Sequence, residues 1–211
     1  MITIYLAQAV RVIIQVVLVF LVPAFALAQQ STPAASAVTA PKAVAADVSE
    51  KNPFTSHSKF TYGFVKEMLL KSAEKMPEES YGFKPVATVR TFGHIIGHAA
   101  DAQIAMCAAA MGWTNPRPNF EKSKITKADL IAALKESFAY CDKAYEELND
   151  AKATEMTKLG GGHPMHRLGA MNANQLHAIE HYGNLITYLR MNNIVPPSSE
   201  PGFGRQQAQK K

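Results

Sequence analysis

Several signatures of well-known protein classes are missing from this 211-residue sequence. It has only two cysteines and no Cys-x-x-Cys-His stretch, which excludes covalent attachment of a c-type haem. No glutamate precedes a histidine by three residues, so the Glu-x-x-His pairs of di-iron carboxylate bundles are absent as well. No segment alternates apolar and polar residues as a half-buried strand does. These absences favour a helical protein with neither a c-type haem nor a di-iron carboxylate centre.

A concentrated basic surface is also missing, although the formal net charge is +5. Part of the positive charge lies at the two ends of the chain, at Arg11, Arg205, Lys210 and Lys211. No dense run of lysine and arginine interleaved with aromatic residues occurs elsewhere, and such a run is what a nucleic-acid footprint requires. We therefore expect no nucleic-acid partner.

The sequence has one apolar run near its start, and the run is too short to cross a membrane. Residues 12–22 are almost entirely apolar and follow Arg11, whereas a helical span needs about 20 apolar residues. Ala26-Leu27-Ala28 then supplies the small-x-small pattern that precedes signal-peptidase cleavage. We expect residues 1–28 to be a signal peptide, Gln29 to begin the mature chain, and the protein to be secreted or periplasmic with no stable membrane span after cleavage. An uncleaved membrane anchor is the alternative.

Composition divides the rest of the chain into three parts. Residues 29–52 are rich in Ala, Pro, Ser, Thr and Val without a periodic apolar face, which predicts a flexible spacer. Residues 196–211 open with two prolines and continue with polar residues, which predicts a disordered tail. The folded domain is therefore expected over residues 53–195.

Four long stretches with helical periodicity, separated by proline and glycine clusters, fill this domain. The predicted helices are Pro53–Lys75, Thr88–Met111, Thr126–Asn149 and His166–Asn192. The connecting residues 78–86 and 115–125 contain proline or glycine and are expected to be non-helical. Four helices of this length without strands predict an all-α, antiparallel four-helix bundle.

The most flexible stretch inside the domain is Gly160–Pro164, which contains three consecutive glycines just before the last predicted helix. Two interpretations remain open for it. It is either a plain linker or a mobile loop that borders a site at one end of the bundle.

Histidines recur at helical spacing in two places. His177 and His181 lie four residues apart on the last predicted helix, so both imidazoles share one face and can reach a single ion. His94 and His98 have the same spacing on the second helix. Two such pairs on helices that can face each other indicate a metal site, whereas one histidine on an apolar face is usually a core residue.

The sequences around these histidines resemble the DinB superfamily. The resemblance is specific over Arg90–Gln103 and Gln175–Arg190, and it extends to Ser72–Pro77 and Tyr81–Pro85. It implies a four-helix bundle in which one histidine of the second helix and an H-x-x-x-H pair of the last helix hold a divalent ion. The implied ligands are His98, His177 and His181. His94 is then a fourth ligand, a group that supports a ligand, or a core residue.

This resemblance implies a metal more firmly than it implies a reaction. Three imidazoles leave coordination positions open for water or substrate, and they suit Zn, Ni, Fe or Mn. Related DinB-like proteins include thiol-dependent transferases and a maleylpyruvate isomerase. We therefore expect a metal-dependent hydrolase or thiol transferase acting on a small molecule, with a non-catalytic metal- or ligand-binding bundle as the alternative. No catalytic residue and no other cofactor are identified. Whether the protein forms a homodimer is left open by the sequence.

Three further residue patterns have competing interpretations. His177-x-x-Glu180-His181 matches the inverted zinc-protease pattern, but the further carboxylate ligand that this pattern needs downstream has only Glu200 to supply it. Cys107 and Cys141 are either buried apolar filler or, in an exported protein, a disulfide. Gly183, next to His181, is expected to permit close packing of helices rather than to have a catalytic role.

Overall fold

The computed structural model describes residues 51–203. The predicted signal peptide, most of the predicted spacer and residues 204–211 of the predicted tail lie outside the described residues.

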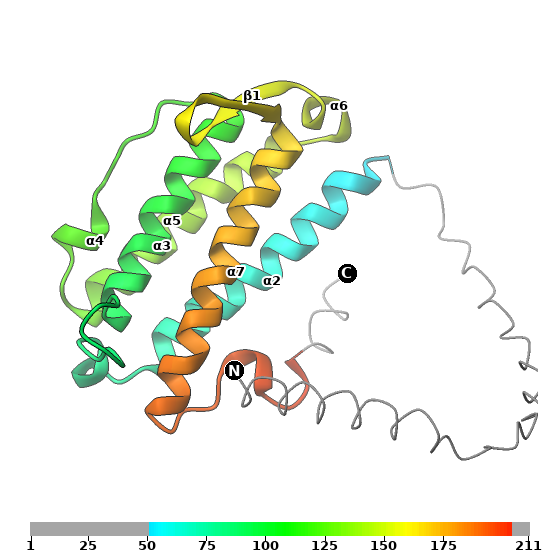
Figure 1. Cartoon of the computed structure of the whole chain (residues 1–211). Helices are drawn as coiled ribbons and strands as arrows, with labels where there is room; N and C mark the ends of the chain where they lie inside the picture. The colour runs from blue at the N-terminus through cyan, green and yellow to red at the C-terminus, as the bar shows by residue number, and fades with distance from the viewer. Residues whose placement is uncertain (1–50, 204–211) are drawn as a thin grey trace, which may run out of the picture. The chain divides into compact units, whose positions relative to one another are not determined.

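Four long helices form an antiparallel bundle, which confirms the predicted fold (Figure 1). They are α2 (Pro53–Lys75), α3 (Phe92–Met111), α5 (Lys127–Glu147) and α7 (Arg167–Met191). Their inward faces supply a core of fully buried side chains, among them Leu69, Ile96, Phe138 and Leu185. Burial of these apolar faces is the main force that holds the bundle together.

Local capping sets several helix ends. The Thr126 side chain caps α5 by accepting a hydrogen bond from the Asp129 backbone N–H at 3.1 Å. Helix α3 begins four residues later than predicted, because Thr91 caps it by accepting from the His94 N–H at 3.2 Å. The same helix ends at Gly112, whose φ of 73° is the left-handed conformation in which glycine costs little.

Two long-range hydrogen bonds define how α3 and α7 lie against each other. Arg167, at the start of α7, donates from Nη1 to the Ala110 carbonyl near the end of α3 at 2.8 Å. Tyr188, near the end of α7, donates from its hydroxyl to the Arg90 carbonyl just before α3 at 2.7 Å. The two helices are therefore antiparallel, and residues in their middle turns face each other.

Short elements occupy the connections. The segments expected to be non-helical contain a single turn each, η1 (Glu78–Ser80) and α4 (Phe120–Ser123), and α6 (Asp150–Ala153) follows α5. A β-hairpin that the sequence did not reveal joins α6 to α7 and consists of β1 (Met156–Leu159) and β2 (His163–His166). Its strands are too short to show a recognisable alternation. The glycine run predicted to be flexible is the turn of this hairpin, η2 (Gly160–Gly162), with positive φ at Gly161 and Gly162.

The bundle continues past Val195, where the sequence indicated a disordered tail. Residues 197–199 form the turn η3, and the buried ring of Phe203 lies 4.9 Å from that of Phe64 on α2. Lys75 and Glu200 form an ion pair that ties this segment to the end of α2. Residues 196–203 are therefore part of the folded unit.

A disulfide joins Cys107 on α3 to Cys141 on α5. Their Cα atoms are 5.5 Å apart, a normal separation for this bond. Of the two interpretations left open by the sequence, the structure has the disulfide rather than two free cysteines.

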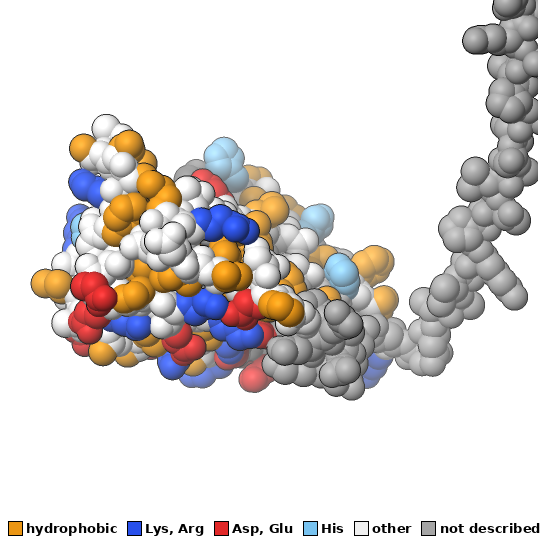
Figure 2. Space-filling model, turned by 90° about the horizontal axis from the view of Figure 1, so that it is seen from below, with side chains coloured by type: hydrophobic (Ala, Val, Ile, Leu, Met, Phe, Trp, Pro, Cys, Tyr) orange, Lys and Arg blue, Asp and Glu red, His pale blue; other side chains and the backbone are white. Residues whose placement is uncertain are grey.

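The surface shown in Figure 2 carries basic and acidic side chains interspersed with apolar ones, so no continuous basic stripe crosses this face of the described residues. Among the helices of residues 51–203, none is long and apolar enough to cross a membrane.

Candidate metal centre

His98, His177 and His181 converge in the middle of the α3–α7 interface. One nitrogen from each ring lies within 4.8 Å of the nitrogens of the other two. The Nε2 atoms of His177 and His181 are 3.1 Å apart, and the ring of His98 lies 4.8 Å from that of His181. The structure thus brings together the three predicted ligands from two helices that are distant in sequence.

Helix geometry and the antiparallel register explain this convergence. Four residues of α-helix turn through about 400°, so His177 and His181 point from the same face of α7. The bonds that fix Ala110 opposite Arg167 and Arg90 opposite Tyr188 place His98 at the level of this pair.

His94 lies outside this group. It is exposed near the start of α3, and the cluster of three histidines does not include it. The interpretation of His94 as a core residue is therefore wrong, and the structure does not place it as a fourth ligand.

A carboxylate holds the ring of His98. The Oε2 atom of Glu121, on α4, lies 3.1 Å from Nδ1 of His98, and its Oε1 accepts from Nε of Arg90 at 2.8 Å. An ionised carboxylate can only accept, so the proton of His98 resides on Nδ1. This tautomer leaves the Nε2 lone pair free, which is the arrangement usual for a metal-binding histidine.

Two residues on α3 bring α4 close enough for this contact. A Cβ atom on Gly97 would lie 2.6 Å from Cα of Glu121, so only glycine permits the approach. One turn of α3 further on, the Asp101 carboxylate accepts from the backbone N–H groups of Phe120 and Glu121 at 2.7 and 3.0 Å. Gly97 and Asp101 therefore position Glu121 for its contact with His98.

Burial keeps the histidines of α7 neutral. Desolvation, followed by the neighbouring imidazoles His177 and His98, lowers the pKa of His181 to about 4. Desolvation and the nearby His98 also lower the pKa of His177. Burial opposes ionisation of Glu121, but its bonds to Arg90 and His98 outweigh that effect and lower its pKa. The site therefore combines neutral imidazoles with an ionised supporting carboxylate.

These residues fit a divalent metal ion. Nitrogens bound to one ion at about 2.1 Å each lie roughly 3–4 Å apart, and the 3.1 Å between His177 and His181 falls in this range. Imidazoles must be neutral to coordinate, and the lowered pKa values of His177 and His181 favour that form. Three protein ligands leave coordination positions open.

A pocket of about 440 Å³, lined by polar and apolar side chains in similar measure, borders the triad. His181 and Arg90 contribute to its wall together with Asn184 and Thr187. A small molecule held in this pocket would lie against a ligand of the proposed ion.

Glu121, Arg90 and Gly97 are site residues that were not predicted from the sequence. Glu121 lies 23 positions from His98, in the segment that connects α3 to α5. No periodicity or motif in the sequence links the two residues. Gly97 did carry a signal, because a glycine inside a strongly helical stretch often marks a close backbone approach. Gly183 proved to be the wrong choice for such packing, since nothing lies within 4 Å of a Cβ built there.

Comparison with solved structures shows what this bundle resembles. A DinB-like protein from Bacillus cereus ATCC 10987 superimposes with a TM-score of 0.56 at 16% identity, over 67% of this chain and 95% of that one. A DinB-like protein from Bacillus subtilis superimposes with a TM-score of 0.53 at 18% identity, over 67% of this chain and 92% of that one. The mycothiol-dependent maleylpyruvate isomerase superimposes with a TM-score of 0.51 at 18% identity, over 63% of this chain and 60% of its own. At these identities the likeness establishes the fold.

Among curated protein sequences, none matches this chain. The sequence model of the DinB superfamily does match, over residues 62–185, a range that begins in α2, ends in α7 and contains all three histidines. With the bundle, the register of α3 against α7 and the converging histidines, this match shows that the chain belongs to the DinB superfamily.

Proposed function

We propose that this protein is an exported, metal-dependent enzyme of the DinB superfamily that acts on a small molecule as a hydrolase or a thiol transferase. One observation carries the proposal: three imidazoles converge on one point, and the wall of an adjoining pocket contains one of them. A purely structural ion is normally enclosed by four protein ligands, whereas three ligands beside a pocket are typical of a reactive site.

Each residue of the site has a distinct task. His98, His177 and His181 would hold the ion, which supplies Lewis acidity and lowers the pKa of a bound water or thiol. Glu121 fixes the tautomer and the orientation of His98, and Arg90 holds Glu121 in place. Asn184 and Thr187 offer hydrogen-bonding groups to a substrate in the pocket beside His181.

The nucleophile is either water or a thiol. The solved structure of a mycothiol-dependent isomerase with a similar bundle favours a thiol. The proposed export favours water as the nucleophile, because low-molecular-weight thiols are cytoplasmic compounds. The disulfide between Cys107 and Cys141 supports export, since such bonds persist mainly in oxidising compartments.

A non-catalytic metal- or ligand-binding bundle is the second candidate, and one observation favours it. Glu121, the carboxylate that contacts the triad, is already bonded to both Arg90 and His98. It is therefore not free to act as a general base.

Elemental analysis followed by a substrate screen tests the proposal. The full-length protein is expected to contain about one divalent ion, and to turn over an ester, amide or thiol substrate in a reaction that a chelator abolishes. His177→Ala should lose both the ion and the activity, whereas the exposed His94→Ala should keep both. Stoichiometric metal without turnover of any substrate would favour the binding bundle.

A further inference from the structure

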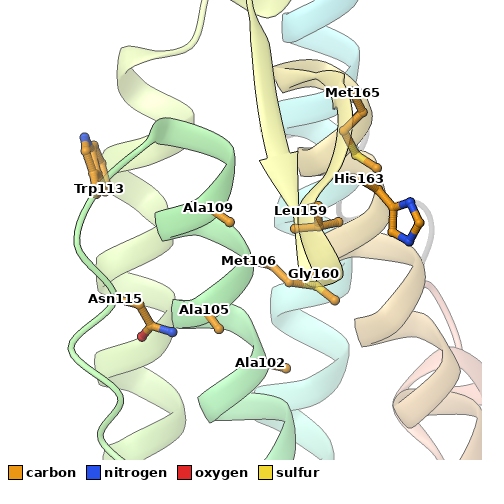
Figure 3. A pocket seen from close by; sticks show the side chains of 10 residues that line it. All are labelled: Ala102, Ala105, Met106, Ala109, Trp113, Asn115, Leu159, Gly160, His163 and Met165. Atoms are coloured by element: carbon orange, nitrogen blue, oxygen red, sulfur yellow. The ribbon is translucent and has the colours of Figure 1, made fainter.

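A second pocket, lined almost entirely by apolar side chains, lies between α3 and the hairpin (Figure 3). Its volume is about 690 Å³, within the range of small-molecule sites. Figure 3 shows α3 on one side and the hairpin tip on the other, and the contributing apolar residues include Ala102, Ala105, Met106, Ala109, Leu159 and Met165.

The alanines of α3 that line this pocket lie on the same face of the helix as His98. Ala102, Ala105 and Ala109 follow His98 by four, seven and eleven residues, and at about 100° per residue all three lie within about 40° of its direction. At about 1.5 Å per residue, Ala102 lies about 6 Å and Ala109 about 16 Å from His98 along the helix axis. A single elongated molecule lying along this face of α3 would therefore span the distance from the triad to the far end of the pocket.

The space exists because this face of α3 carries small side chains. Ala102, Ala105 and Ala109 are only partly buried, whereas Ile104 and Cys107, on the opposite side of the helix, are fully packed in the core. Larger residues at the three alanine positions would fill the pocket without touching the core.

The hairpin forms the outer wall, and its base is anchored to the end of α3. Thr157 on β1 donates from its hydroxyl to the Ala109 carbonyl at 2.5 Å. At the end of β2, Arg167 pairs with Glu155 at 2.9 Å and also bonds to Ala110. The wall therefore has a fixed position relative to the alanines opposite it.

The shape and chemistry of the pocket favour a small apolar group over a protein partner. It is an open pocket bordered by three elements, namely α3, the hairpin and the loop that contains Trp113 and Asn115. A concave apolar space of this size buries most of the surface of a small ligand, whereas a protein partner needs a broader face. Burial of an alkyl or aryl group here would be favourable in proportion to its area.

We propose that this pocket binds the apolar part of an amphiphilic substrate whose polar end lies at the His98–His177–His181 site. The substrate class is thus a medium-length alkyl or aryl compound with an oxygen- or sulfur-containing group at one end. This inference rests on the proposed function, because it assigns the polar end to the metal.

Two hydroxamates that differ only in the length of the alkyl chain test whether the pocket binds the apolar part of a metal-bound ligand. Hydroxamate groups chelate protein-bound metal ions, so acetohydroxamate reports on the ion alone and octanohydroxamate on the ion and the pocket together. In the metal-loaded, full-length protein, octanohydroxamate should bind at least about tenfold more tightly, since its chain leaves water. Trp113 is the only tryptophan and lines the pocket, so its fluorescence should change with the octanoyl compound alone.

The variant Ala105→Leu/Ala109→Leu should remove this tenfold preference and leave acetohydroxamate affinity unchanged. The matched control is Ala132→Leu/Ala139→Leu, which adds the same atoms to exposed positions of α5 and should keep the preference. Alanine and leucine have similar helix propensities, and melting curves of both variants check that the bundle remains folded.

A metal-independent ligand separates this inference from the proposed function. 1-Octanol should saturably change Trp113 fluorescence in wild type and in His177→Ala, but not in the double leucine variant. If wild type binds both hydroxamates equally, or shows no saturable response to 1-octanol, the apolar pocket is not a substrate site even though the protein binds metal. If the octanol response is present and the protein holds no metal, the proposed function fails, and with it the assignment of the polar end.

Discussion

Gly97 and Glu121 are packed so closely that a single added methyl group on Gly97 would overlap the Glu121 backbone, at 2.6 Å from Cα and 2.9 Å from N. This contact allows the Glu121 carboxylate to reach the ring of His98. Because the clashing atoms are backbone, α4 would have to move as a whole to relieve the overlap.

Gly97→Ala should therefore displace Glu121 and weaken the metal site. We expect lower metal affinity together with a loss of stability of about 1–3 kcal/mol, as for other overpacked sites. Gly63→Ala is the matched control, because nothing lies within 4 Å of its added Cβ and alanine favours the helix by about 0.5–1 kcal/mol. Chelator competition and urea denaturation measure the two effects, and equal behaviour of the two variants would contradict the packing argument.

Glu121→Ala should lower metal affinity by about 10–100-fold while the bundle remains folded. The physical reason is that His98 loses the acceptor that fixes its tautomer and ring orientation. Glu121→Gln keeps an acceptor oxygen, so its metal affinity should fall less than that of Glu121→Ala. Glu180→Ala, an exposed neighbour of His181, serves as the control in the same competition titration, and an equal loss there would point to general charge effects instead.

Removal of a ligand should remove the ion. His98→Ala, His177→Ala and His181→Ala are each expected to abolish stoichiometric binding and to cancel the rise in Tm that added metal gives wild type by mass action. His94→Ala should behave as wild type, because His94 is exposed and outside the triad. Elemental analysis and thermal melts with and without metal check this. A requirement for His94 equal to that for His98 would disprove the three-ligand assignment.

The metal-free protein should lose stability as the pH falls from about 6.5 to about 4. In the unfolded chain His181 titrates near its usual pKa of about 6.5, whereas in the folded protein its pKa is lowered to about 4. Between these values the unfolded state takes up a proton that the folded state does not, so the free energy of unfolding decreases. Urea denaturation across this range, in wild type and in His181→Leu, measures the effect. An equally steep pH dependence in His181→Leu would show that other groups cause it.

Reduction of the disulfide should destabilise the bundle by about 3–4 kcal/mol, the range expected for a bond that closes a loop of this length. Cys107 and Cys141 are 34 positions apart, and both are fully buried. Thiol alkylation of the unfolded, non-reduced protein should find no free cysteine, since the sequence has only these two. Detection of two free thiols in protein purified from an oxidising compartment would contradict the bond.

The sequence by itself determined the features that depend on residues close together along the chain. Helical periodicity determined the four helices, and the four-residue spacing of His177 and His181 determined that they share a face. A local side-chain bond made Thr126 a helix cap. The choice of His98 over His94 also came from the sequence, although it rested on the resemblance to the DinB superfamily rather than on spacing.

Only the tertiary structure decided which residues from separate segments meet. The bond of Glu121 to His98, the disulfide between Cys107 and Cys141, and the burial of Phe203 all join positions that no short-range pattern connects. The contrast between Gly97 and Gly183 has the same origin: both lie within a long helix, but α4 packs against only the first. Periodicity fixes the direction in which a side chain leaves its own helix, whereas the partner it meets depends on the packing of the whole chain.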